Sequence, residues 1–299
     1  MKTHKLSGTV IGLLCCAAPS QTALKGAASL QLIQAFVGFN QPNDLGMPCS
    51  GCLGFSSSTV WVQPNQFVSP GSTGLYYAVF QNGGWSGSLS ASFVLRGGGA
   101  VIQNTVINGS VSSSQDFFVL SGNATIPQTS YSGPAVLVAT TTATPGDGSS
   151  PLTLTSSAVM MVGTTGIYGL VQVFAGIGMG SNVFPCTGCG PPGAVGIQPN
   201  QILGPGGGGS EYVVFQAHDW EGSVTSTLDV VEKSGVTQSQ TLVASIEGHD
   251  VVSVVGGGTI EAGSSYSGPA SLRATSTATS RRGAFESFTF QSFSPFYIE

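Results

Sequence analysis

The sequence predicts an all-β protein made of two tandem antiparallel β-sandwich domains of the immunoglobulin-like type, with jelly-roll-like domains as the alternative. Three observations predict this fold class. The second half of the chain repeats motifs of the first half. Short runs of β-branched and aromatic residues alternate with clusters of Gly, Pro and Ser, which is typical of strands and turns. Beyond the N-terminal segment, no long stretch has the 3.6-residue periodicity of a helix.

The chain begins with a segment that is typical of export. A basic start, MKTHK, is followed by the short apolar run 6–18 and then by small residues. This order is that of a secretory signal peptide, and the run is shorter than the about 20 residues that a membrane-spanning helix needs. We therefore expect residues 1–28 to hold a signal peptide and an N-terminal segment. We also expect an extracellular or cell-surface location and no transmembrane segment in the mature chain.

An internal duplication divides the rest of the chain. The motif VQPNQ at 62–66 returns as IQPNQ at 197–201, and a constant offset of 135 aligns residues 59–144 with the second copy without a gap. We expect two similarly folded repeats at 29–164 and 165–299, each with about seven or eight short strands. Because the segment that joins them is short, the repeats should lie close together.

Each repeat carries one C-x-x-C motif in its first loop. After removal of the signal peptide, four cysteines remain: Cys49 and Cys52 in the first copy, and Cys186 and Cys189 in the second. Export leads to an oxidising compartment, and the motifs lie in Pro/Gly loops rather than at a helix N-terminus. We therefore expect one local disulfide in each repeat. A shared zinc site with four cysteine ligands and a redox-active pair are the alternatives. We expect no other metal and no cofactor.

Two aromatic positions recur in both copies. Tyr131 and Tyr266 lie in the motif SYSGPA, just before the penultimate strand of each repeat. This position resembles a tyrosine corner, whose hydroxyl bonds to nearby backbone, so we expect a structural role. Trp85 and Trp220 follow the same strand in each copy. Their shared placement favours packing in the core, whereas an exposed indole would indicate stacking on a sugar or a partner.

Ionisable residues gather at one predicted end of the second repeat. Alternate loops of an antiparallel sandwich share an end, so the loops at 217–222, 247–250 and 280–283 should lie together. Such loop ends often carry binding residues, although polar loops are also simply solvated. Imidazole and carboxylate groups can ligate a metal or act in acid–base chemistry. The candidate binding residues are His218, Asp219, Trp220, Glu221, His249, Asp250, Arg281 and Arg282, with Trp85 at the matching place in the first repeat.

The composition limits the classes of function. Charged residues make up 7% of the chain and the net charge is −5, with no basic stripe, which argues against a nucleic-acid partner. No nucleophile motif occurs in the strand–turn–helix context that it needs. We therefore expect a secreted or surface-exposed non-enzymatic protein in adhesion, extracellular matrix assembly or ligand binding. The alternative is a secreted carbohydrate-binding or metal-dependent hydrolytic protein that uses the polar loop end of the second repeat.

The expected partners are further copies of the chain, or an extracellular protein or glycan. One specific form of self-association is the addition of a strand to a sheet edge of another chain. Segment 20–39 is apolar and uncharged apart from Lys25, and it is the candidate donated strand.

Overall fold

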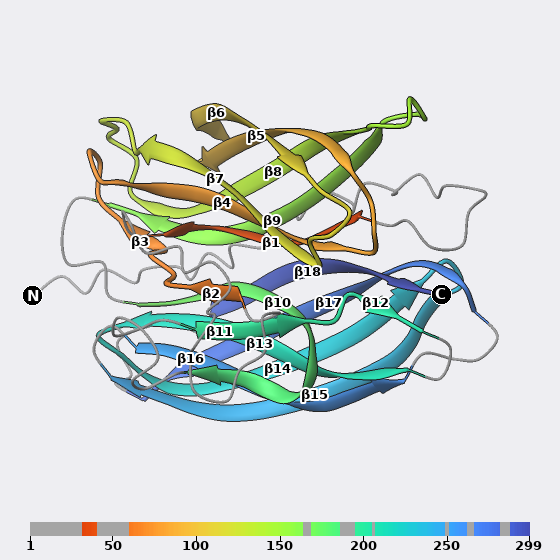
Figure 1. Cartoon of the computed structure of the whole chain (residues 1–299). Helices are drawn as coiled ribbons and strands as arrows, with labels where there is room; N and C mark the ends of the chain where they lie inside the picture. Colours follow the sequence, from red (N-terminus) through yellow and green to blue (C-terminus); the bar gives the residue numbers. More distant parts are fainter. Residues whose placement is uncertain are drawn as a thin grey trace, which may run out of the picture.

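The protein is an assembly of strands packed as four sheets. The computed structural model describes residues 32–40, 60–163, 169–185, 195–204, 207–248, 251–261, 266–281 and 288–299. Within these ranges every regular element is a β-strand and none is a helix, so the all-β prediction is confirmed. Most of the first repeat forms the upper half of Figure 1, and the second repeat forms the lower half.

The first repeat builds two sheets. One has the order β1-β4-β7 and consists of β1 (Leu32–Asn40), β4 (Thr73–Asn82) and β7 (Phe117–Thr125). The other has the order β3-β9-β8-β5-β6 and consists of β3 (Phe67–Val68), β5 (Gly87–Gly97), β6 (Ala100–Val111), β8 (Gly133–Pro145) and β9 (Leu152–Val162). Neighbouring strands are antiparallel, except that β3 runs parallel to β9.

The second repeat builds the other two sheets. One has the order β16-β13-β10-β11-β2 and consists of β10 (Gly169–Pro185), β11 (Val195–Pro199), β13 (Gly208–His218), β16 (Val251–Glu261) and β2 (Val60–Val62). The other has the order β12-β18-β17-β14-β15 and consists of β12 (Ile202–Leu203), β14 (Trp220–Glu232), β15 (Gly235–Gly248), β17 (Gly268–Ser280) and β18 (Phe288–Ile298). Strand β2 belongs to the first repeat by sequence, yet it extends a sheet of the second.

Alternating side chains place one core inside each repeat. Four side chains of β5 are buried: Leu89, Ala91, Phe93 and Leu95. Ser90 and Ser92, which alternate with the first three of them, point to the solvent side. This follows from the strand geometry, in which successive side chains point to opposite faces. The buried side chains of both sheets meet in one apolar cluster per repeat. Burial of each large apolar side chain contributes about 1.5–3 kcal/mol.

A third apolar cluster lies between the two repeats. All nine residues of β1 are buried, and so are residues 169–178 of β10, because each strand is covered on both faces. The rings of Phe36 and Phe174 stack with their centroids 4.2 Å apart and their planes at 9°. Tyr77 and Tyr212 belong to the same cluster. The junction of the two repeats therefore has an apolar core of its own.

A buried glutamine ties the two sheets together in each repeat. The pairing of β1 with β4 shifts register between Gln34 and Phe36. There Gln34 Nε2 donates to the carbonyl oxygen of Ala139 at 3.0 Å and to Ser156 Oγ at 2.7 Å, on β8 and β9. Gln172 makes the two corresponding bonds to β17 and β18. Since a buried polar group without partners destabilises a fold, these bonds fix how the sheets are positioned.

The first strand is not available for donation to another chain. Leu32–Asn40 pairs with β4 of its own repeat along its length, from Leu32 opposite Asn82 to Asn40 opposite Leu75. The donated-strand hypothesis for 20–39 is therefore wrong for the part from Leu32 onward, because this strand already belongs to a sheet of its own repeat. Residues 20–31 lie outside the described ranges.

The substitution Phe174→Ala tests the contact between the repeats. The ring is 1% exposed and stacks on Phe36, so its loss leaves a cavity at the junction of the repeats. We expect the free energy of unfolding, measured by urea denaturation, to fall by about 3–5 kcal/mol. The control is Val243→Ala, where the side chain is 72% exposed and the expected change is within about 0.5 kcal/mol. Equal effects of the two changes would contradict this account of the interface.

Candidate functional site

One sheet of the first repeat presents an ordered field of hydroxyl groups to solvent. Ser90 on β5 lies directly opposite Asn108 on β6 and Thr142 on β8, and Thr142 lies opposite Thr153 on β9. All four residues are exposed. Neighbouring strands are about 4.8 Å apart, so the polar groups form closely spaced rows. We call this surface the first hydroxyl face; its hydroxyl residues are Ser88, Ser90, Ser92, Ser110, Thr140, Thr142, Thr144, Thr153, Thr155 and Ser157.

The second repeat carries a related surface. Thr225 on β14 lies opposite Thr277 on β17, which lies opposite Thr289 on β18. Thr225 and Thr277 are the counterparts of Ser90 and Thr142 at the constant offset of 135. We call this surface the second hydroxyl face; its hydroxyl residues are Ser223, Thr225, Thr227, Ser239, Thr241, Ser245, Thr275, Thr277, Thr279 and Thr289.

The hydroxyl groups of these faces make neutral hydrogen bonds, and one exposed valine lies among them on each face, Val106 opposite Ser92 and Val243 opposite Thr225. Each Ser or Thr hydroxyl donates one hydrogen bond and accepts others, and it stays neutral across the physiological pH range. Short side chains lose little rotamer entropy when a ligand orders them. Threonine also favours strands because it is β-branched. The hydroxyl groups of both faces can therefore bind a hydroxyl-rich ligand.

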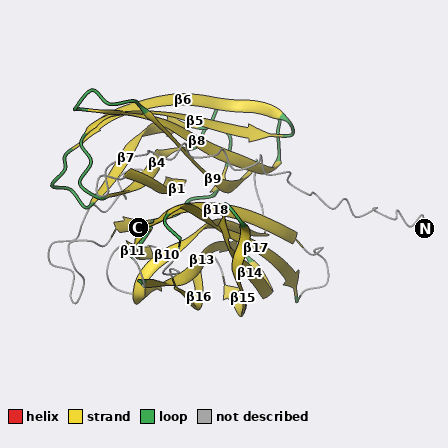
Figure 2. Ribbon diagram, turned by 90° about the vertical axis from the view of Figure 1, so that its right-hand side faces the viewer, coloured by secondary structure: helices red, strands yellow, loops and turns green. Residues whose placement is uncertain are grey.

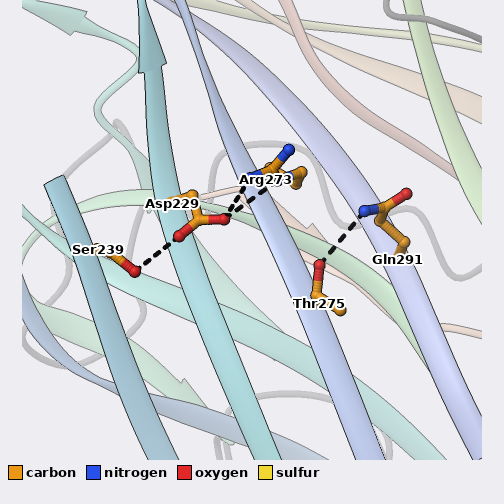
Figure 3. Close-up of polar contacts among 5 residues, drawn as sticks. All are labelled: Asp229, Ser239, Arg273, Thr275 and Gln291. Atoms are coloured by element: carbon orange, nitrogen blue, oxygen red, sulfur yellow. Dashed lines mark hydrogen bonds and ion pairs between the residues drawn. The ribbon is translucent and has the colours of Figure 1, made fainter. Parts of the chain in front are cut away.

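An ion pair distinguishes the second hydroxyl face from the first. Arg273 donates from Nε and Nη2 to Asp229 Oδ2 at 3.1 and 2.6 Å, and Ser239 Oγ donates to Asp229 Oδ1 at 2.7 Å (Figure 3). The two charged residues occupy the places of Val94 and Val138, which lie opposite each other in the first repeat. A cross-strand valine pair has thus been replaced by a guanidinium and a carboxylate.

The surroundings of Asp229 favour its charged form. Partial burial raises the pKa of the Asp229 carboxyl, but the hydrogen bonds from Ser239 and Arg273 and the charge of the guanidinium outweigh it. The pKa therefore lies below its usual range. Gln291 donates to Thr275 at 3.3 Å in the next row, so polar contacts continue across the sheet (Figure 3).

A second acidic group is buried behind this sheet. Glu211 on β13 is 2% exposed and accepts a hydrogen bond from Gln240 Nε2 at 2.9 Å. It occupies the place of Tyr76, whose hydroxyl donates to Gln103 at 2.5 Å in the first repeat. Desolvation raises the pKa of the Glu211 carboxyl; the bond from Gln240 opposes this change, and the negative charge of Asp229 adds to it. The net pKa lies above its usual value.

The loop end of the second repeat brings together part of the predicted binding set. Glu221 lies directly opposite Glu247, and the backbone N–H of Arg281 donates to the carbonyl oxygen of Glu221 at 3.0 Å. The Arg281 guanidinium forms an ion pair with Glu247 and donates to Ser245. Both ends of the ion pair are more than half exposed, so the pair contributes little to stability. The binding role of this end stays a prediction.

Other predicted site residues have different surroundings. The His218 ring lies 5.7 Å from the ring of Phe67 on β3, at the contact between the repeats. Asp219 follows it in a left-handed backbone conformation with φ of 49°. Asp250, His249, Arg282 and the four cysteines, Cys49, Cys52, Cys186 and Cys189, lie outside the described residues. The disulfide, zinc and redox interpretations therefore stay predictions.

The repeated aromatic residues are parts of the framework. Trp85 and Trp220 are 4% and 2% exposed and pack in the two cores, so they are not open platforms for stacking on a ligand. A Cβ atom at Gly87 would clash with the carbonyl oxygen of Thr144 and lie 2.6 Å from the Trp85 ring, and Gly222 has the equivalent neighbours, which explains the glycine two residues after each tryptophan. The Tyr131 and Tyr266 hydroxyls donate to the carbonyl oxygens three residues further on.

The hydroxyl faces were missed in the sequence analysis, although the sequence contains a signal for them. Ser or Thr recurs at every second residue at 88–92, 140–144, 223–227 and 275–279. This period of two identifies the outward side of a strand, but only the sheet order shows that these runs are neighbours. No group of three or more potential metal-ligating side chains occurs within the described ranges. Among the same residues, no helix is long and apolar enough to cross a membrane.

Comparisons with known proteins do not assign a family. No protein-family model and no curated protein matches the chain. Red sea bream transglutaminase is similar with a TM-score of 0.25 and 10% identity, over 92% of this chain and 32% of that one. Spo0M, the sporulation control protein of Bacillus subtilis, is similar with a TM-score of 0.26 and 9% identity, over 62% of this chain and 89% of that one. The chain spans about a third of the transglutaminase, and likenesses this weak carry no argument about activity.

The first repeat supplies the control for a test of the ion pair. Arg273→Val leaves the Asp229 carboxylate without its partner, so we expect the free energy of unfolding to fall by about 1–2 kcal/mol at pH 7. The double change Asp229→Val with Arg273→Val recreates the valine pair of the first repeat. It should lower the free energy of unfolding by less than Arg273→Val alone. A lowered pKa gives stability that is lost as the pH falls through it. The effect of Arg273→Val should therefore shrink in urea denaturation below about pH 3.9. A double variant less stable than Arg273→Val would contradict this.

Glu211→Gln tests the buried carboxyl. Because the pKa of Glu211 is raised in the folded protein, its contribution to stability is complete below the unfolded value of about 4.3 and is lost as the pH rises through the folded value. The neutral amide keeps the shape without a charge. We expect the variant to have a higher Tm than the parent at pH 7 and a much smaller difference at pH 4, measured by thermal denaturation. The same difference at both pH values would show that the charge is not the cause.

Proposed function

We propose that this protein is exported and works without catalysis in adhesion or in the extracellular matrix. In this proposal, its two hydroxyl faces bind a neutral, hydroxyl-rich polymer, that is, a polysaccharide. The observation that carries the proposal is the pair of matched Ser/Thr fields on two sheets, one in each repeat. Export rests on the signal-like N-terminus, and it would place both C-x-x-C motifs where disulfides form.

We further propose that each repeat is an immunoglobulin-like sandwich. The longer strands of the first repeat can be counted along the chain. The first, second and fifth (β1, β4 and β7) form one sheet. The other sheet has the spatial order seventh, sixth, third, fourth (β9, β8, β5, β6). The longer strands of the second repeat have the same order. Immunoglobulin-like sandwiches place their first, second and fifth strands together in this way, and members of the wider group differ in the sheet that takes the fourth strand. This order supports that fold over a jelly roll.

The surface chemistry favours a neutral polysaccharide over other partners. Charged ligands need complementary charge, and the described strands of the sheet that carries the first hydroxyl face have one charged residue, Arg96, near the end of β5. A sugar polymer offers hydroxyl groups at short regular intervals, and these match donors and acceptors repeated every second residue. Sheets twist by about 20–25° from strand to strand, so a flexible chain can follow the face whereas a flat crystalline surface cannot.

The arrangement of the two faces supports bridging between surfaces. Strands β5 and β6 lie at the top of Figure 1, and β14 and β15 lie at the bottom. The view in Figure 2, turned by 90°, keeps this separation. The two hydroxyl faces therefore extend to opposite ends of the molecule. A protein with two separate sites for one polymer gains avidity and crosslinks polymer chains.

Bead agglutination tests the proposal. Monomeric protein purified by size exclusion is mixed with beads coated with mannan, dextran or a soluble β-glucan. Thr142→Glu and Thr277→Glu place a carboxylate in the centre of one face each. We expect the parent to agglutinate beads of at least one kind. Each single variant should bind the beads without agglutinating them, and the double variant should lose binding at least tenfold.

The matched control is Ser121→Glu, which makes the same type of change at an exposed position of β7 on the other sheet. This variant should agglutinate beads as the parent does. Failure of the parent to bind any of the coated beads would overturn the proposal. Undiminished agglutination by the double Thr142→Glu, Thr277→Glu variant would also overturn it.

A further inference from the structure

The contact between the repeats has internal two-fold symmetry. Strand β2 of the first repeat pairs antiparallel with β11 of the second, with Val60 opposite Ile197 and Val62 opposite Val195. Trp61 and Gly196 face each other at the centre. These two residues are counterparts at the offset of 135, so each repeat contributes the same segment to the pairing. Such a contact is isologous, as in a two-fold homodimer.

Two reciprocal hydrogen bonds follow the same symmetry. The backbone N–H of Gln66 donates to Gln216 Oε1 at 2.7 Å, and the backbone N–H of Gln201 donates to Gln81 Oε1. Gln66 and Gln201 end the QPNQ motifs, and Gln81 and Gln216 end the VFQ motifs. Two segments that recur unchanged in both copies therefore bind each other across the interface.

The apolar centre of the interface has the same symmetry. Phe36 stacks on Phe174, and these residues are counterparts because they lie opposite Val79 and Val214, which are 135 residues apart. Val79 and Val214 both belong to the apolar cluster between the repeats. The β2–β11 pairing, the two glutamine bonds and the phenylalanine stack each join a part of one repeat to a part of the other.

We infer that this interface also binds a second copy of the chain, by exchange of repeats. The first repeat of one chain docks on the second repeat of another chain and makes the same β2–β11 pairing, glutamine bonds and phenylalanine stack. The contact energy is equal in both forms, because the interface contains only contacts between repeats. At low protein concentration the closed monomer predominates, since the second repeat of the same chain has a high effective concentration near the first. Folding at high protein concentration favours exchanged dimers or longer chains.

The observed contact joins unlike repeats, since β2 of the first repeat pairs with β11 of the second. An exchanged form that keeps this contact joins the first repeat of one chain to the second repeat of another.

A mixed-chain crosslink tests the exchange. One preparation carries Val62→Cys and another carries Val195→Cys, at positions that lie opposite each other in the β2–β11 pair. Opposite residues of antiparallel strands are about 4.5–5.5 Å apart at Cα, which suits a disulfide. The two full-length chains are mixed in denaturant, refolded together at low and high concentration, and oxidised. We expect a dimer on non-reducing gels whose peptide map joins position 62 of one chain to position 195 of the other, in an amount that rises with concentration.

Three controls distinguish exchange from other thiol chemistry. Each variant refolded alone shows the background from the native cysteines. A mixture of Val195→Cys with Val106→Cys, which lies on the exposed side of β6, should give no crosslink between those positions. The parent protein should also form dimers by light scattering after refolding at high concentration. A parent that stays monomeric at every concentration, or a crosslink that is equally abundant in the Val106→Cys control, would overturn the inference.

Discussion

Burial of β1 and β10 on both faces is the constraint on which the rest of the structure depends. A strand in a two-sheet unit ordinarily turns one side toward the core and the other toward water. Here each first strand has a second apolar neighbour, the other repeat, and Phe36 stacks on Phe174 where they meet. The buried glutamines Gln34 and Gln172 then orient these strands against the outer sheets. These contacts position the four sheets. The two hydroxyl faces belong to the surface that remains exposed to solvent.

The two copies share a framework and differ in the polar groups placed on it. The tryptophan–glycine and tyrosine positions, the glutamine bonds and the strand order recur in both. The second repeat adds Asp229 and Arg273 in place of two valines, and Glu211 in place of Tyr76. In both cases the added charge has a hydrogen-bond partner, as the cost of burying an unpaired charge requires. The framework therefore tolerates different chemistry on the second hydroxyl face while the contact between the repeats is kept.

Much of the fold followed from local pattern. The alternation in β5 and the recurring Gly, Pro and Ser clusters predicted strands, because the period of a strand and the conformations of turns depend on neighbouring residues. The candidate site was predicted less completely from the sequence. Glu221, Glu247 and Arg281 lie together at one end of β14, β15 and β17, and a binding role of this end stays a prediction. The hydroxyl faces were not predicted, because Ser90, Thr142 and Thr153 are far apart in the chain and become neighbours only through the order of the strands.

The sequence by itself determined the strand content, the duplication and the shortage of charge, since composition and local periodicity encode all three. Only the tertiary structure decided what the repeated motifs do. QPNQ and VFQ appeared as marks of a duplication, and the structure makes them the two halves of a reciprocal contact between repeats. The physical reason is that complementarity between distant segments depends on how the sheets pack. The same reason explains β1: its apolar sequence suited an exposed donor strand as well as a buried one, and pairing with β4 and cover by the second repeat decided between them.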